Sequence, residues 1–254
     1  MSNIIYVDVE TNGYKGLDIL SKYNRIIQFG ALSNDFEFEM FVNPGIPISP
    51  SSTKFHGIND FMVRDAQRFD KVWEIFLSKL DKNQTHYFLV AHGGTFFDKI
   101  MIIKELHRFG VDFDSSRFTF IDTDPILRHH LPNAQSHNLG SLVRQYIPSY
   151  NFQGEHTALA DCKALKVLIE GMNVPLEPKV RDDFKLIYEL GNYKWLLKEY
   201  SGVENTTELA NTLPSFVVYR WIKCNVHGIT EDQAVMAILR IYNFDPNIIK
   251  QHIF

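Results

Sequence analysis

The sequence predicts an α/β fold, in which helices pack against a central mixed sheet of five strands. The order of the elements is the first reason, because three strand-like segments come first and strands then alternate with helices. The second is the tight "SND" turn at 33–35, which forces the segments beside it into an antiparallel hairpin. The third is the almost wholly apolar segment 86–92, a pattern typical of a strand covered on both faces.

Each element follows from a local pattern. Short apolar runs bounded by turn residues predict strands at 3–10, 25–33, 35–42, 86–92 and 117–123, with a proline-punctuated loop at 43–50. Apolar residues at helical spacing predict helices at 69–82, 95–109, 137–147 and 156–172. Gly110 ends the second of these helices, and Gly171 with Pro175 closes the fourth.

The pattern changes near residue 175. Beyond "NVPLEPKV" (173–180) the chain offers helical periodicity, as at 182–200 and 230–242, and no convincing strand. We therefore expect a first domain over 1–174 and an all-helical extension over 175–254. With nine Lys or Arg and ten Asp or Glu, the extension is not a basic tail. We expect it to dock on the first domain, to contact a protein partner or a second copy, or to shape a substrate channel.

Composition excludes several classes of protein. The 254 residues are 45% hydrophobic and 22% charged, as in soluble globular proteins, and the net charge of −4 gives no bulk attraction for nucleic acid or anionic membranes. Cys162 and Cys224 are far apart, so neither a zinc ribbon nor a disulfide framework is indicated. Without a signal peptide or an apolar run of about 20 residues, we expect a soluble protein of the cytoplasm or nucleus with no membrane partner.

Two carboxylates stand at the end of the first predicted strand, in "IIYVDVETNG" (4–13). Alternate residues of a strand point the same way, so Asp8 and Glu10 should lie side by side and repel each other. A solvated strand end is the simple alternative. Two further acids stand out: Asp98 begins a helix, where the helix dipole alone would favour it, and Asp161 lies in an apolar helix. For Asp161 the alternative is an exposed polar stripe shared with Lys163 and Lys166.

Four acids that met at one place would need positive charge. Carboxylate oxygens suit Mg²⁺ or Mn²⁺, and two such ions can activate a water and stabilise the leaving oxygen of a phosphodiester. His156 stands five residues before Asp161, in the loop "NFQGEH", where it could take the proton of that water. A solvent-exposed loop histidine is the alternative.

Three segments, "DVETNG", "AHGGTFFDKIMI" and "HTALADCKA", resemble the motifs of the DnaQ-like (DEDD) 3′–5′ exonucleases, in the DEDDh subclass whose last motif has His five residues before Asp. The likeness extends to "FVNPGIPISPSSTKFHGI" (41–58), "FIDTDPILRHHLP" (120–132) and "HNLGSLVRQYIP" (137–148), and so covers about residues 1–172 in order. It implies a ribonuclease H-like fold and a divalent-metal-dependent 3′–5′ exonuclease.

The resemblance also implies roles for single residues. It makes Asp8, Glu10, Asp98 and Asp161 the ligands of two Mg²⁺ or Mn²⁺ ions, and His156 the general base. Residues that would hold the 3′-terminal nucleotide are Thr11, Asn12 and Gly13 after the second acid, His56, and Phe97, read mainly as core with a stacking role. Two positions depart from the family: Gly93 stands where Asn is usual, and Asn12 where Thr is common.

The implied reaction is hydrolysis from nucleic-acid 3′ ends, single-stranded DNA favoured, that releases nucleoside 5′-monophosphates. An RNA-trimming exoribonuclease is the alternative. A catalytically silent binding module is disfavoured because a scaffold needs none of the five catalytic-type residues. A hydrolase of small phosphates is disfavoured by the family features outside the acid positions.

Overall fold

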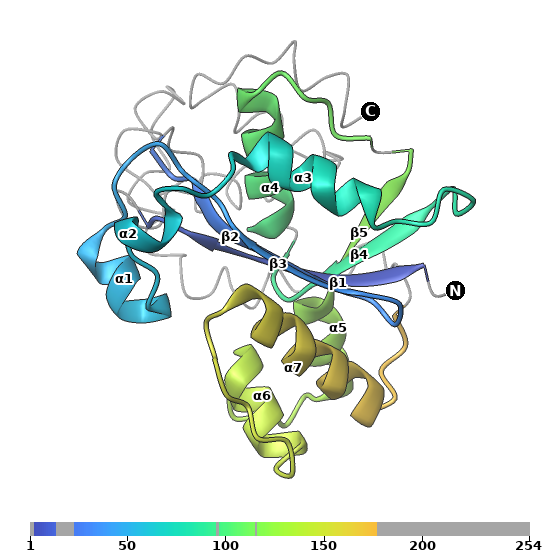
Figure 1. The fold of residues 1–254 in the computed structure, drawn as a ribbon. Coiled ribbons are helices and arrows are strands. Elements are labelled where there is room, and N and C mark those ends of the chain that lie inside the picture. Colours follow the sequence, from blue (N-terminus) through green and yellow to red (C-terminus); the bar gives the residue numbers. More distant parts are fainter. Residues whose placement is uncertain (1–2, 14–22, 95–96, 115, 177–254) are drawn as a thin grey trace, which may run out of the picture. The chain divides into compact units, whose positions relative to one another are not determined.

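The computed structural model describes residues 3–13, 23–94, 97–114 and 116–176, which all fall in one compact unit of the chain (Figure 1). The predicted extension over 175–254 lies almost wholly outside these residues, and the division at residue 175 stays a prediction. No helix in the described part of the chain is long and apolar enough to cross a membrane.

The predicted mixed sheet of five strands is confirmed. The strands lie in the order β3-β2-β1-β4-β5, with β1 antiparallel to β2 and parallel to β4. The hairpin expected around 33–35 is the antiparallel pair β2–β3, and β4–β5 is parallel. The strands are β1 (Ile4–Thr11), β2 (Ile26–Leu32), β3 (Glu37–Phe41), β4 (Tyr87–Ala91) and β5 (Phe118–Asp122).

Helices cover both faces of the sheet (Figure 1). Helices α3 (Phe69–Ser78) and α4 (Asp98–Arg108) lie on one face, and α5 (Thr123–His130), α6 (Leu139–Tyr146) and α7 (Ala158–Gly171) lie on the other. Two short helices, α1 (Pro50–His56) and α2 (Asp60–Val63), stand together at one end of the sheet.

Three of these helices were not predicted. Helices α1, α2 and α5 have eight residues or fewer, and unlike the equally short α6 they have too few apolar residues to show helical spacing. Hydrogen bonds from their first turns to capping side chains stabilise these helices instead. In α1 the Ser49 side chain accepts a hydrogen bond from the Ser52 N–H, Pro50 occupies the first turn, and Gly57 ends the helix at φ +78°. In α5 the Asp122 side chain accepts from the Asp124 N–H.

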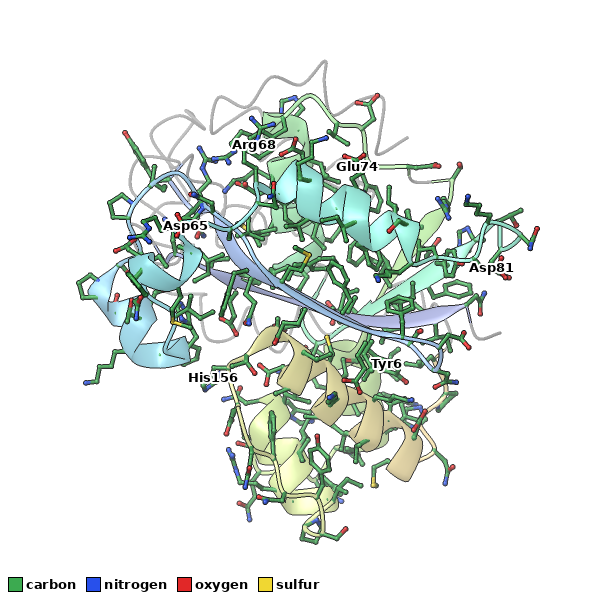
Figure 2. All side chains as sticks on the ribbon, viewed as in Figure 1. Tyr6, Asp65, Arg68, Glu74, Asp81 and His156 are labelled. Atoms are coloured by element: carbon green, nitrogen blue, oxygen red, sulfur yellow. The ribbon has the colours of Figure 1, made fainter. Side chains whose placement is uncertain are left out.

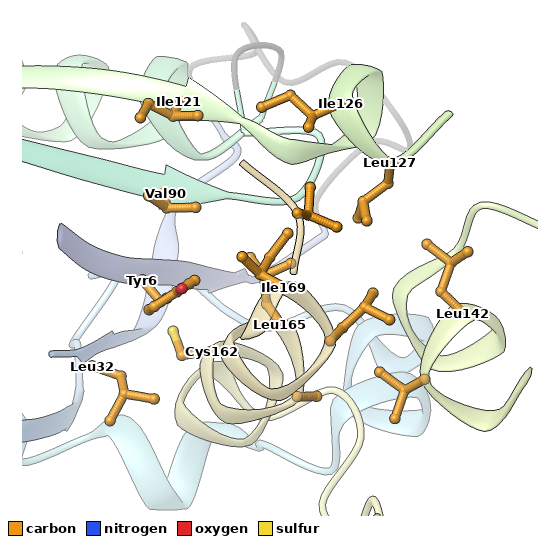
Figure 3. Close-up of a cluster of buried hydrophobic side chains, with 14 of the residues drawn as sticks. Tyr6, Leu32, Val90, Ile121, Ile126, Leu127, Leu142, Cys162, Leu165 and Ile169 are labelled. Carbon is orange, nitrogen blue, oxygen red and sulfur yellow. The ribbon is translucent and has the colours of Figure 1, made fainter. Parts of the chain in front are cut away.

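The two faces of the sheet have different cores. Under α5, α6 and α7 the core is mainly aliphatic, and Tyr6, Leu32 and Val90 of the sheet pack against Cys162, Leu165 and Ile169 of α7 (Figure 3). Under α3 the core is aromatic, because Phe29 of β2 contacts Phe69, Trp73 and Phe76. Strand β1 thus faces α7 with Tyr6 and, two and four residues later, with Asp8 and Glu10.

Candidate active site

The two carboxylates of β1 lie beside the acid of α7, as the strand alternation predicts. One oxygen from each of Asp8, Glu10 and Asp161 can be chosen so that all three lie within 4.8 Å of one another. The two lysines of the alternative for Asp161, an exposed stripe, contact other groups: Lys163 pairs with Glu37 and Lys166 donates to Asn34. Three acids from two distant segments therefore form one cluster that could bind a metal ion.

A glycine in β2 lets α7 approach the sheet closely. Gly30 is the partner of Asp8 in the β1–β2 register. A Cβ atom on Gly30 would lie 2.5 Å from the carbonyl carbon of Ala158 and 2.7 Å from the backbone nitrogen of Leu159. The first turn of α7, which contains Asp161, therefore rests directly on the backbone of β2.

Two polar side chains of the sheet fix the start of α7. The N–H of Ala158 donates to Gln28 Oε1 and that of Leu159 to Glu39 Oε1, both at 3.0 Å. These N–H groups belong to the first turn, which has no acceptor within its own helix. Neither side chain was predicted to act here, although a buried Gln inside the apolar segment "IIQFGAL" is a visible signal that such a partner is needed.

Asp98 joins the cluster from α4. It is the first residue of that helix, it is 2% exposed, and its Oδ1 accepts a hydrogen bond from the Val9 N–H at 3.0 Å. The last β1–β4 partner pair is Tyr6–Val90, so Val9 lies where β1 has run past the end of β4. Asp98 therefore takes the place of the missing strand neighbour, which holds its carboxylate next to Asp8 and Glu10.

The electrostatics of the cluster favour a bound cation. Burial, followed by the repulsion of neighbouring carboxylates, raises the pKa of Asp8 well above its usual range and that of Glu10 to about 8. Burial also raises the pKa of Asp98 to about 8 and that of Asp161 to about 7. Asp8 Oδ2 is buried and has no hydrogen-bond partner among the described residues. A hard cation could take that oxygen as a ligand and offset the repulsion between the carboxylates, so these carboxylate ligands fit Mg²⁺ or Mn²⁺.

His156 lies at the entrance to α7, on the side of α1 (Figure 2). Its backbone has φ +70°, a left-handed conformation that is uncommon outside glycine, and its N–H donates to Asp161 Oδ1 at 3.3 Å. Its imidazole ring stacks on Phe55 of α1, with centroids 3.8 Å apart and an angle of 31° between the planes. The structure therefore ties His156 to the carboxylate cluster through Asp161, while Phe55 was not predicted to take part in the site.

The turn after β1 is braced by α1. The Thr11 carbonyl accepts hydrogen bonds from Ser52 Oγ at 3.3 Å and from His56 Nε2 at 3.1 Å. His56 Nε2 carries the proton, because Nδ1 accepts from the Ile58 N–H. Gly13 follows with φ +58°. Both His56 and Thr11 are buried. Burial lowers the pKa of His56, which keeps its imidazole neutral.

Two of the predicted substrate residues lie otherwise than expected. The Asn12 side chain is fully buried: its amide donates to the carbonyls of Tyr23 and Pro47, and its oxygen accepts from the Arg25 N–H. The interpretation of Phe97 as mainly a core residue is wrong, because its side chain is 38% exposed. Phe97 is the N-cap residue of α4, and the buried apolar side chains of that helix all come after it.

The departure at Gly93 has a backbone explanation. Gly93 has φ +74°, and a Cβ atom placed there would meet no atom of the described residues within 4 Å. Its N–H donates to Asp122 Oδ1 at 2.9 Å, and the same oxygen accepts from the Asp124 N–H. Asp122 thus joins the end of β4 to the start of α5 through these two hydrogen bonds.

A family model and several known proteins match this chain. The model of the exonuclease family RNase_T matches residues 5–168. The DNA polymerase III PolC-type of Caldanaerobacter subterraneus subsp. tengcongensis is 30% identical over 165 residues, which cover 63% of this chain and 11% of the polymerase. In Streptococcus pneumoniae the corresponding polymerase is 31% identical over 173 residues, 65% of this chain and again 11% of the polymerase. The chain therefore matches about a ninth of these relatives.

Solved structures share the fold. Cell-death related nuclease 4 (CRN-4) has a TM-score of 0.53 at 16% identity, over 68% of this chain and 66% of that one. The 3′-exonuclease in a structure of 3′-end specific recognition of the histone mRNA stem-loop has a TM-score of 0.54 at 17% identity, over 68% and 65% of the two chains. At these identities the likeness is one of fold.

Proposed function

Because the chain belongs to the exonuclease family and is a DnaQ-like 3′–5′ exonuclease, we propose that it removes nucleoside 5′-monophosphates from single-stranded DNA 3′ ends, with two divalent cations and His156 as general base. The observation that carries this proposal is the carboxylate cluster. Asp8, Glu10 and Asp161 lie together, and Asp98 is held against the same strand. Their mutual repulsion destabilises the site when no cation is bound. Cations bound there would serve the hydrolysis of a phosphodiester.

Asp8, Glu10, Asp98 and Asp161 would hold two Mg²⁺ or Mn²⁺ ions. When bound, such ions activate a water and stabilise the charge that develops on the phosphodiester. His156 would accept the proton of the attacking water, for which its ring nitrogens are available: they have no hydrogen-bond partner in the described part of the chain. Its exposure to solvent is intermediate, so the proton can leave after each turnover.

The 3′-terminal nucleotide would lie at the end of β1. Gly13 presents backbone there without a side chain, and Thr11 and His56 hold the turn in place. The buried Asn12 would act through the position of the backbone and not through its amide. Phe97 would offer an exposed ring beside Asp98 on which a base can stack. DNA is favoured over RNA as substrate because the PolC-type relatives are DNA polymerases.

The decisive experiment offers 5′-labelled single-stranded DNA, duplex DNA and RNA of one sequence to the full chain with Mn²⁺ or Mg²⁺. We expect a ladder of 3′-shortened products, fastest on single-stranded DNA, and no products in EDTA. The matched control for Asp8→Asn, expected to be inactive, is Glu74→Gln, which removes an exposed acid of α3 that pairs with Lys71. Internal cleavage, 5′ shortening, or full activity in EDTA would each contradict the proposal.

His156→Ala tests the base separately. Loss of a general base lowers kcat by roughly 10²–10⁴-fold, so the variant should retain a measurable residual rate and unchanged metal binding. A variant with the kcat and the pH–rate profile of the wild type would show that another group takes the proton.

A further inference from the structure

We propose that Phe55 of α1 is the positioning residue of His156: its exposed ring holds the imidazole by stacking, and so sets the distance of the base from the carboxylate cluster. This inference rests on the proposed function, in which His156 is the general base. It adds a residue that touches neither the cations nor, in this role, the substrate.

Among the described residues, the contact with Phe55 is the one ring contact of the imidazole. Ring centroids of Phe55 and His156 lie 3.8 Å apart and the two planes are tilted by 31°, so the rings are in close contact. Within the described residues the imidazole nitrogens make no hydrogen bond, and only the backbone N–H of His156 reaches Asp161. In many active sites a carboxylate or carbonyl orients such a histidine through a hydrogen bond. Here the Phe55 ring orients the imidazole instead.

The exposure of Phe55 supports a role beyond packing. Its side chain is 62% exposed, so it contributes little to either core of the domain. Its stack on His156 is also its one aromatic contact in the part of the chain that the structure describes. The Phe55 ring is exposed and lies against His156, whose backbone is left-handed at φ +70°. This exposure is explained if the ring limits the rotation of the imidazole.

Helix α1 gives Phe55 a fixed position relative to β1. The helix has a side-chain cap at Ser49 and a left-handed glycine at its end. It is joined to the end of β1 by three hydrogen bonds, from the Ser49 N–H to the Asn12 carbonyl and from Ser52 and His56 to the Thr11 carbonyl. The strand that contributes Asp8 and Glu10 therefore also determines, through α1, where the Phe55 ring stands.

The consequence is a link between two segments that are far apart in sequence. His156 belongs to the loop before α7, and the strand acids belong to β1. The stack holds this loop against α1, at the turn where the terminal nucleotide is proposed to lie. A misplacement of a reacting group by about 1 Å costs roughly 10²-fold in rate, so loss of the ring should lower kcat by about 10- to 100-fold.

The test compares Phe55→Leu, which keeps an apolar side chain, with Phe55→Tyr, which keeps the ring. The matched control is Phe61→Leu, which removes a 75% exposed phenylalanine of α2 whose ring lies under the guanidinium of Arg64. We expect Phe55→Leu to lower kcat by about 10- to 100-fold on single-stranded DNA with KM changed less than about twofold, and Phe55→Tyr to restore most of the loss. In a His156→Ala background the Phe55→Leu change should have no further effect.

A spectroscopic measurement reports the contact without any turnover. In the full-length wild type, the ring protons of His156 should be shifted by the aromatic ring above them. The shift should disappear in Phe55→Leu and persist in Phe55→Tyr and Phe61→Leu. Thermal melts of all variants should agree, because Phe55 lies outside the core.

Two results would overturn the positioning role. One is a rise in KM with unchanged kcat that vanishes on a substrate without a terminal base, because Phe55 would then stack on the substrate. The other is an unchanged His156 signal in Phe55→Leu. A wild type that shortens no 3′ end would instead refute the proposed function itself, which keeps the two failures distinct.

Discussion

Gly30→Ala should damage both the fold and the site through a single methyl group. Gly30 lies opposite Asp8 in the sheet, under the first turn of α7. The added Cβ would lie 2.5 Å from the Ala158 carbonyl carbon and 2.8 Å from the Ala158 Cβ, where ordinary contacts begin near 3.4 Å. Both neighbours are backbone or directly attached to it, so no side-chain rotation can relieve the overlap.

The size of the effect follows from these distances. Helix α7 must move by roughly 1 Å, and overpacking of this kind costs about 1–3 kcal/mol of unfolding free energy. The same movement strains the hydrogen bonds that the Ala158 and Leu159 N–H groups donate to Gln28 and Glu39, each worth about 1 kcal/mol. We therefore expect a total loss of about 2–4 kcal/mol. Because Asp161 moves with the helix, activity should fall by roughly 10²-fold.

Urea denaturation with Mg²⁺ present, together with 3′-shortening rates, would measure both effects. The matched control is Gly171→Ala at the opposite end of α7, where, among the described residues, the added Cβ meets only the flexible tip of Ile147. That change should alter stability by less than about 1 kcal/mol, since alanine favours the helix, and leave activity intact. A Gly30→Ala protein as stable and active as the wild type would refute the close approach of α7 to β2.

Three further predictions concern charge. The pKa of Glu10 and that of Asp98 are about 8 in the fold, above their ordinary values of 4.5 and 3.8. The stability that this gives the metal-free protein is therefore present at low pH and lost as pH rises through about 8. Thermal melts in EDTA should show a lower Tm at pH 9 than at pH 5, and Mg²⁺ should restore it at pH 9; a Tm that rises with pH in EDTA would contradict this. Asp161→Asn should abolish 3′ shortening yet raise the metal-free Tm at pH 9, because one repelling charge is gone; near-wild-type turnover would remove Asp161 from the ligand set. Glu105→Ala should cost about 3–5 kcal/mol in urea denaturation, because the fully buried Glu105 carboxylate lies 3.4 Å from both Arg25 and Arg108. A loss below 1 kcal/mol would show that these arginines are solvated.

Much of the fold was predictable because its signals are local. The period of two in β1 placed Asp8 and Glu10 on one face, and the tight turn at 33–35 made β2 and β3 a hairpin. The short helices α1 and α5 were missed, because they are specified by single capping residues and not by periodicity. Missing α1 also meant missing Phe55, which looks like any apolar residue in the sequence.

Other features depend on segments far apart in the chain, and only the tertiary structure decided them. Nothing in the sequence distinguishes Gly30 from the other glycines of the chain, 14 in all, and only the structure shows that α7 packs directly on it. Asn12 reads as a substrate ligand until its amide is found bonded to the backbone of Tyr23, Arg25 and Pro47. Phe97 reads as core until it is found 38% exposed.

The sequence by itself determined the family, the sheet and the order of the chemical groups, because strand period and motif spacing are properties of neighbouring residues. The tertiary structure decided which side chains stand free at the site and which only support it. That choice depends on burial and on contacts between distant segments: hydrogen bonds bring Asp98 to Val9 and Gln28 to Ala158, and a ring contact brings Phe55 to His156.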